Sequence, residues 1–238
     1  RLPAGGGMNT TTASGGEHKD PFDLLALEKY LQQHIPGFSG PVTATRFKGG
    51  QSNPTYLLTT PTRQYVMRAK PGPVAQLLPS AHAVEREFRL QSALAGSAVP
   101  VAGMHCLCED ESVIGRAFYV MDFIEGRIFW EQSLPGMEAT ERSAIYAELN
   151  RVIAALHGVD FAALGLADYG KAGNYFSRQI DRWTRQYRAS ETVGIVAMDQ
   201  LIDWLPRHIP QEENPQVSLV HGDYRIDNVI FHPDEPRI

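Results

Sequence analysis

The chain has 238 residues, which is enough for one large domain or two small ones with a buried core. Hydrophobic residues make up 43% and charged residues 21%, as in ordinary globular proteins, which excludes fibrous and wholly disordered classes. The net charge is −5 and the basic residues form no block, so we expect no binding to nucleic acid or to a membrane. We therefore expect the function to reside in a discrete pocket.

The cysteines and the N-terminal sequence are the features from which the cellular location is predicted. The only cysteines, Cys106 and Cys108, are too close in sequence for an ordinary disulfide and lack the paired spacing of a zinc site. The N-terminal segment has no secretory apolar stretch, and no apolar run reaches the ~18 residues of a membrane span. These features predict a protein of the reducing cytoplasm.

The N-terminal part is predicted to be a leader followed by a helix. Residues 1–19 are small and polar without periodicity, so we expect a disordered leader. Asp20 and Pro21 are predicted to begin a helix, since an N-cap residue followed by Pro is a start signal. Its apolar face is formed by Leu24, Leu27, Leu31 and Ile35.

Short β-type runs follow and then give way to helices. The runs 42–47, 55–60 and 64–69 are separated by tight turns, which predicts an antiparallel sheet. A helix at 81–95 and a strand at 117–124 follow. Helical stripes then recur up to Leu205, and strands are predicted again at 217–220 and 229–231. The predicted fold class is α+β, with a strand-rich half, a joint near 122–126 and a helix-rich half.

The strongest chemical signal is the segment 221–228, which reads HGDYRIDN. It places a carboxylate, Asp223, and a carboxamide, Asn228, on one predicted loop. Phosphoryl transfer needs a carboxylate that orients and deprotonates an acceptor hydroxyl and an oxygen ligand for magnesium. A polar turn with an Asp cap is the alternative interpretation of this pattern alone.

Two further segments are candidates for binding phosphate. The first is a hairpin of small residues in which paired glycines and a hydroxyl can approach phosphate oxygens, although plain turn chemistry gives the same pattern: Gly49, Gly50, Gln51, Ser52 and Asn53. The second is Glu87, which lies on the apolar face of the 81–95 helix, opposite Glu85. An inward carboxylate needs a cation, and Arg68 or Lys70 can supply it. A purely structural ion pair is the alternative.

In their order along the chain, these motifs resemble the aminoglycoside phosphotransferase and choline kinase-like family of small-molecule kinases, which share the bilobal protein-kinase fold. The resemblance covers residues 47–238 and is carried by FKGGQSNPTYLL, YVMR, AVEREFRLQSAL, FYVMDFIEG and VHGDYRIDNVIF. It is strongest to the kinase-like domains related to those fused to acyl-CoA dehydrogenases. The resemblance implies a nucleotide-binding N-terminal lobe at 20–124, a hinge at 122–126 and a C-terminal lobe at 125–238.

The resemblance implies ATP and Mg²⁺ as cofactors and a small-molecule hydroxyl as acceptor, with a hydroxyacyl-CoA type among the candidates. Asp223 is then the base and Asn228 a magnesium ligand. The main-chain carbonyl of Asp122 and the N–H of Ile124 are expected to bind the adenine edge. A basic helix face could bind an anionic acceptor or be merely solvated: Arg178, Arg182, Arg185 and Arg188. Trp183 and Tyr187 are expected in the core.

The sequence departs from the expected pattern in three places, and the first is Gly222, which replaces the Arg that precedes the catalytic Asp in many protein kinases. Arg68 stands where the family usually has Lys, so Lys70 remains an alternative phosphate ligand. In the family the next strand carries an Asp that binds both magnesium ions, and the sequence ends at Ile238 before it. We therefore expect an incomplete C-terminal lobe with exposed apolar surface and no catalysis by the chain as given. A non-catalytic nucleotide- or metabolite-binding module is the alternative function.

Overall fold

A computed structural model describes residues 22–47, 53–71, 83–170, 173–210 and 217–238 of the chain. The predicted leader, 1–19, lies outside these ranges. The chain divides into two compact units, one formed by residues 1–159 with 220–238 and the other by residues 160–219. Among the described residues, no helix combines the length and the apolar character that crossing a membrane requires.

The first helix, α1, spans Leu24–His34 and begins later than the sequence suggested. The side chain of Asp23 accepts hydrogen bonds from the main-chain N–H groups of Leu25 and Ala26, at 2.9 and 3.2 Å. Asp23 is therefore the N-cap, and the assignment of this role to Asp20 was wrong. The physical reason is that Asp23, three residues after Asp20, accepts hydrogen bonds from main-chain N–H groups of the first helical turn, which have no partner within the helix.

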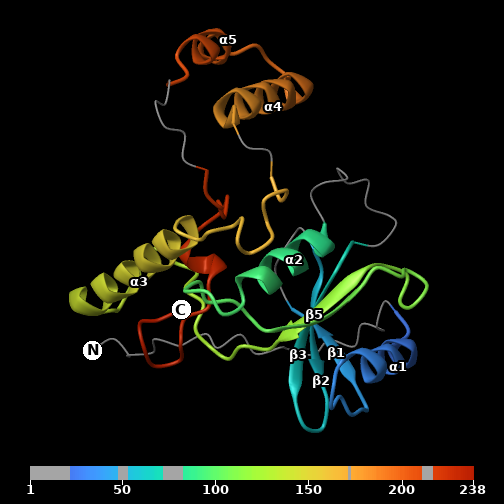
Figure 1. The fold of residues 1–238 in the computed structure, drawn as a ribbon. Coiled ribbons are helices and arrows are strands. Elements are labelled where there is room, and N and C mark those ends of the chain that lie inside the picture. Colours follow the sequence, from blue (N-terminus) through green and yellow to red (C-terminus); the bar gives the residue numbers. More distant parts are fainter. Residues whose placement is uncertain (1–21, 48–52, 72–82, 171–172, 211–216) are drawn as a thin grey trace, which may run out of the picture. The chain divides into compact units, whose positions relative to one another are not determined.

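Five strands form one antiparallel sheet in the order β1-β2-β3-β5-β4 (Figure 1). Their bounds are Thr43–Arg46 (β1), Thr55–Thr59 (β2), Gln64–Ala69 (β3), Met104–Cys108 (β4) and Phe118–Asp122 (β5). All pairings are antiparallel, as the short runs and tight turns predicted. The register between β3 and β5 places Arg68 directly opposite Tyr119.

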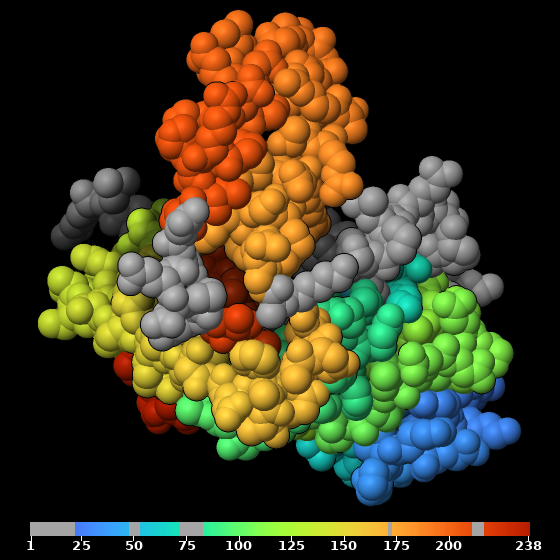
Figure 2. Space-filling model, turned by 45° about the horizontal axis from the view of Figure 1, so that its top comes forward, coloured from blue at the N-terminus to red at the C-terminus, as the bar shows by residue number. Residues whose placement is uncertain are grey.

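The two faces of the sheet are covered by different helices. On one face, α1 residues Leu27 and Leu31 pack with Phe118 and Val120 of β5 in the largest core cluster. The space-filling view shows α1, in blue, against the green and cyan sheet segments (Figure 2). On the other face, helix α2 (Val84–Leu94) packs against Tyr119. Alternation along β5 thus sends successive side chains to opposite faces.

Helix α3 (Ala139–His157) supports the segment that contains Asp223. Its buried residues follow the helical spacing predicted from the sequence: Ile145, Leu149, Val152 and Leu156. Ile145 and Leu149 pack with Ile226 and Phe231 in a separate core cluster. This cluster fixes the second half of the candidate catalytic loop (residues 221–228), and the segment that follows it, to one helix.

The strands predicted at 217–220 and 229–231 were wrong. Residues 217–220 have no strand conformation, and Phe231 forms only an isolated bridge with Arg127. A short 3-10 helix, η2 (Ile226–Asn228), lies between these segments. A β-type sequence becomes a strand only where a neighbouring strand satisfies its main-chain groups, and within the described residues Arg127 alone pairs with Phe231.

The second unit contains helices α4 (Tyr175–Ser190) and α5 (Val196–Trp204) and a 3-10 turn, η1 (Leu205–Arg207). No residue of these two helices is fully buried. Trp183 is 56% exposed, so its assignment to the core was wrong, whereas Tyr187 is partly buried. Arg188 joins α4 to α5 through an ion pair with Asp199 at 2.6 Å.

Candidate functional site

The candidate catalytic loop brings Asp223 and Asn228 into contact. The amide nitrogen Nδ2 of Asn228 donates to the main-chain carbonyl and to Oδ2 of Asp223, at 2.9 Å in each case. The η2 turn produces this contact, since the Asn228 N–H also donates to the Arg225 carbonyl at 3.0 Å. The Asp223 side chain remains 68% exposed. It is therefore oriented and accessible at the same time.

The loop is anchored to α3 at its centre. The Tyr224 hydroxyl donates to the Leu149 carbonyl at 2.9 Å, and Ile226 is buried in the cluster beneath the loop. Gly222 has a φ of +83°, a conformation that favours glycine, and this bend sets the direction of the chain just before Asp223. Tyr224 and Ile226 thus anchor the loop to α3, while the Asp223 side chain faces solvent.

Sequence reasoning missed an ion pair inside the same loop. The guanidinium of Arg225 meets both carboxylate oxygens of Asp227, with Nε at 3.1 Å from Oδ1 and Nη2 at 2.5 Å from Oδ2. Arg225 Nε also lies 3.7 Å from Oδ1 of Asp223. The available signal was that Arg225 and Asp227 carry opposite charges two residues apart. This spacing alone does not show that the Arg225 cation lies beside Asp223, the proposed base.

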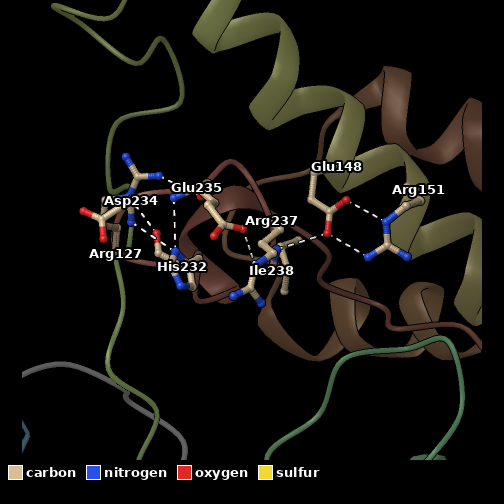
Figure 3. A network of polar contacts seen from close by, with 8 residues as sticks. All are labelled: Arg127, Glu148, Arg151, His232, Asp234, Glu235, Arg237 and Ile238. Carbon is tan, nitrogen blue, oxygen red and sulfur yellow. Dashed lines mark hydrogen bonds and ion pairs between the residues drawn. The ribbon is translucent and has the colours of Figure 1, made fainter.

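The segment after the loop is tied back to the rest of its unit (Figure 3). Arg127 donates to the carbonyls of His232 and Glu235, at 2.9 Å each. The Ile238 N–H donates to Glu148 at 3.1 Å, and Glu148 also accepts two hydrogen bonds from Arg151, at 2.6 and 2.7 Å. The pKa of Glu148 is lowered, mainly by the hydrogen bonds from Arg151.

The approach of this segment to the residues after β5 requires a glycine. Arg127 and Phe231 exchange two main-chain hydrogen bonds, at 2.7 and 2.9 Å. A Cβ atom at Gly126 would lie only 2.3 Å from the Phe231 carbonyl oxygen. The small residue at position 126 is therefore needed for the bridge between the two segments.

Two parallel ion pairs join β3 to α2. Arg68 Nε lies 3.0 Å from Oε2 of Glu87, and Lys70 Nζ lies 3.2 Å from Oε2 of Glu85. Glu87 thus pairs with Arg68, whereas Lys70 has another partner. The interpretation of Glu85 as facing away from the sheet was wrong, because the first turn of α2 lies close enough to the end of β3 for a long lysine side chain to reach it.

Glu87 has two more partners, which link it to other elements. Asn53, which is 3% exposed, donates from Nδ2 to Glu87 Oε1 at 3.1 Å. The Tyr119 hydroxyl donates to Oε2 at 3.0 Å, and Gln91 donates to the Tyr119 oxygen at 3.4 Å. Burial first, and then the negative charge of Glu87, raises the pKa of Tyr119. Sequence reasoning missed Tyr119, because its place opposite Arg68 depends on the strand register.

Of the two predicted adenine contacts, Asp122 is the last residue of β5, and Ile124 lies two residues after the strand and is exposed. The Asp122 N–H donates to the Gly103 carbonyl at 2.8 Å. Its carboxylate is held by Arg63 at 2.6 Å and His105 at 2.7 Å, on the face that carries Phe118 and Val120. The Asp122 side chain is thereby directed away from the face that holds Tyr119.

Asn228 and Asp223 carry side-chain oxygen atoms that are suitable ligands for magnesium. Because Asn228 uses its nitrogen toward Asp223, its amide oxygen can serve a cation, and Asp223 adds a carboxylate. These are oxygen ligands of the kind that Mg²⁺ takes from proteins in nucleotide sites, alongside phosphates and water. Among the described residues, no group of three or more His, Cys, Asp or Glu side chains could hold a metal. Gly49, Gly50, Gln51 and Ser52 lie outside the described ranges.

Known structures resemble this chain in fold. A Ralstonia eutropha protein solved as a candidate aminoglycoside phosphotransferase is 62% identical, with a TM-score of 0.81 over 91% of this chain and 62% of that one. The aminoglycoside 2′-phosphotransferase-IIIa, solved with GDP, is 15% identical, with a TM-score of 0.60 over 90% of this chain and 69% of that one. The second similarity concerns the fold alone. The predicted α+β, protein-kinase-like fold is confirmed.

Sequence relatives are longer proteins. Acyl-CoA dehydrogenase family member 10 of Mus musculus is 49% identical over 214 residues, which are 90% of this chain and 20% of that protein. Family member 11 of Homo sapiens is 42% identical over 226 residues, 93% of this chain and 28% of that protein. The chain thus spans about a fifth to just over a quarter of these relatives. Residues 43–238 match the phosphotransferase enzyme family model, and the chain belongs to that family.

Proposed function

We propose that this protein transfers the γ-phosphoryl group of ATP to a hydroxyl of a small molecule. The observation that carries the proposal is the contact between Asn228 and Asp223, which orients an exposed carboxylate on a loop anchored to α3. Asp223 accepts the proton of the acceptor hydroxyl. The acceptor oxygen bonds to the γ-phosphorus as the bond to the bridging β-phosphate oxygen breaks, and ADP leaves.

Arg68, with Glu87, is proposed to bind the nucleotide phosphates. Its ion pair with Glu87 is formed by Nε, and the terminal nitrogens Nη1 and Nη2 have the fork geometry that suits phosphate oxygens. Lys70, which pairs with Glu85, is proposed to contribute less to phosphate binding than Arg68. The loop Gly49–Asn53 is proposed to cover the phosphates with its main-chain N–H groups. We expect Arg68→Ala to raise the KM for ATP by about tenfold and Lys70→Ala to raise it less.

Magnesium and adenine complete the proposed nucleotide site. The Asn228 amide oxygen, with Asp223, would hold magnesium, which supplies neutralisation of the charge on the phosphates when bound. The main-chain carbonyl of Asp122 and the N–H of Ile124 would bind the adenine edge at the hinge between the proposed lobes 20–124 and 125–238. Because the Asp122 carboxylate is bound by Arg63 and His105, its main chain is the part offered to the base.

The acceptor is proposed to be a metabolite hydroxyl, with hydroxyacyl-CoA esters as the first class to test. The support is that the longer relatives are named as members of the acyl-CoA dehydrogenase family. The arginines of α4 add little support: Arg188 is paired with Glu191 and Asp199, and Arg185 Nε donates to a carbonyl of its own helix. A cytoplasmic location is proposed from the free, buried thiols of Cys106 and Cys108.

The test is ATP turnover with magnesium across a panel of hydroxylated metabolites and acyl-CoA esters. It should be run on this chain and on a version extended through the strand that the family pattern places next. We expect acceptor-dependent ADP formation in the extended version. ATP binding without turnover in both versions would instead favour a non-catalytic binding module.

A further inference from the structure

Tyr119, which the proposed mechanism does not use, is a buried residue that contacts the polar side chains of Glu87 and Gln91. Only 1% of this residue is exposed, and its hydroxyl both donates to Glu87 at 3.0 Å and accepts from Gln91 at 3.4 Å. A buried phenol needs such partners, so a structural role is the simplest explanation. Its partner Glu87, however, also connects Tyr119 to Arg68, because the oxygen Oε2 that accepts from Tyr119 is the one that pairs with Arg68.

Glu87 is fixed from three sides. Tyr119 reaches it from β5, Asn53 from the chain just before β2, and Arg68 from β3. A carboxylate held by one arginine alone can rotate together with it, whereas one held by two further groups acts as a fixed anchor. The anchored carboxylate forms its ion pair with the guanidinium at Nε. Since that group is planar, its orientation determines where Nη1 and Nη2 point.

We infer that Tyr119 is a positioning residue for nucleotide phosphate binding, acting on Arg68 through Glu87. The inference rests on the proposed function, in which Arg68 binds the phosphates. Tyr119 stands opposite Arg68 in the strand register and three residues before Asp122, where the adenine edge is proposed to bind. The tyrosine thus connects the adenine end of the nucleotide site to its phosphate end.

The test compares Tyr119→Phe with Tyr56→Phe, measuring the Kd of ATP with magnesium and the Kd of adenosine. Tyr56 is a matched control, since it is a buried tyrosine of the same sheet, 2% exposed, and is assigned no part in the site. We expect Tyr119→Phe to weaken ATP binding about three- to tenfold and to leave adenosine binding unchanged. Tyr56→Phe should change neither.

The inference would be overturned by unchanged ATP affinity in Tyr119→Phe. Equal weakening of ATP and adenosine binding would also overturn it, because this would indicate a general disturbance of the sheet. In an Arg68→Ala background, Tyr119→Phe should cause no further loss, because the two act in series. If Tyr119→Phe fails to fold, Gln91→Leu decides, since it keeps the ring but removes the donor to its hydroxyl. That variant should weaken ATP binding in the same direction, and unchanged affinity would overturn the inference.

The Arg68→Ala arm separates this inference from the proposed function. If Arg68→Ala weakens ATP binding and Tyr119→Phe does not, the phosphate site stands and the role of Tyr119 is refuted. If Arg68→Ala has no effect on ATP affinity, or if the parent protein binds no ATP, the proposed phosphate site fails and the inference fails with it.

Discussion

The Asn228 amide nitrogen lies 2.9 Å from Oδ2 of Asp223 and 2.9 Å from the Asp223 carbonyl. One side chain thus holds both the main chain and the carboxylate of the residue proposed as the base. The other carboxylate oxygen faces Arg225 at 3.7 Å. The two carboxylate oxygens of Asp223 therefore have different surroundings: one accepts from Asn228 and the other faces Arg225.

Asn228→Ala should lower kcat by about 10²-fold, because the base loses its orientation and magnesium loses an amide oxygen. The magnesium concentration needed for half-maximal turnover should rise as well, which a magnesium titration at saturating ATP measures. Asn150→Ala, on the adjacent surface of α3, is the control and should behave like the parent. A lowered kcat with an unchanged magnesium requirement would remove Asn228 from the metal site.

Arg225→Met should lower kcat by at least about tenfold while leaving the KM for ATP nearly unchanged. The reason is that the guanidinium, held by Asp227, places a positive charge beside Asp223, where the proposed mechanism has the phosphoryl charge develop. Arg237→Met is the control, since Arg237 forms an exposed pair with Glu235. Equal kcat values for the two variants would show that Arg225 only stabilises the loop.

Gly126→Ala should destabilise the fold by about 1–3 kcal/mol, because the added methyl group meets the Phe231 carbonyl and forces the two segments apart. Denaturant unfolding measures this change. Gly170→Ala is the control, since a Cβ there meets no atom of the described residues within 4 Å. If both variants unfold at the same denaturant concentration, the bridge between Arg127 and Phe231 contributes little to stability.

Acidification should destabilise the parent more than Glu148→Gln. The pKa of Glu148 is lowered mainly by the Arg151 hydrogen bonds, so its folded value lies below its unfolded value. The resulting stabilisation is present above the unfolded pKa and is lost as pH falls through the folded pKa. Unfolding free energies of both proteins at neutral and acidic pH measure the difference. An identical loss on acidification would rule out a contribution from Glu148.

The parts of the structure that depend on near neighbours were predictable. The β-type runs of β3 and β5 identified strands, and the apolar stripe on α3 identified a helix with its buried face. The pattern from Asp223 to Asn228 placed two polar groups together. Tyr119 was not predictable, because its contact with Glu87 spans 32 residues and depends on how β5 pairs with β3. The strand predicted at 217–220 failed for the complementary reason: apolar residues alone do not supply a pairing partner.

The central claim is that Asp223 activates a hydroxyl for phosphoryl transfer from ATP. Its most direct test is transfer of labelled γ-phosphate to an acceptor, comparing the extended protein with its Asp223→Asn and Asp234→Asn variants. We predict that Asp223→Asn lowers turnover by about 10²–10⁴-fold with ATP affinity nearly unchanged, while Asp234→Asn retains parental turnover. Parental turnover in Asp223→Asn would contradict the account.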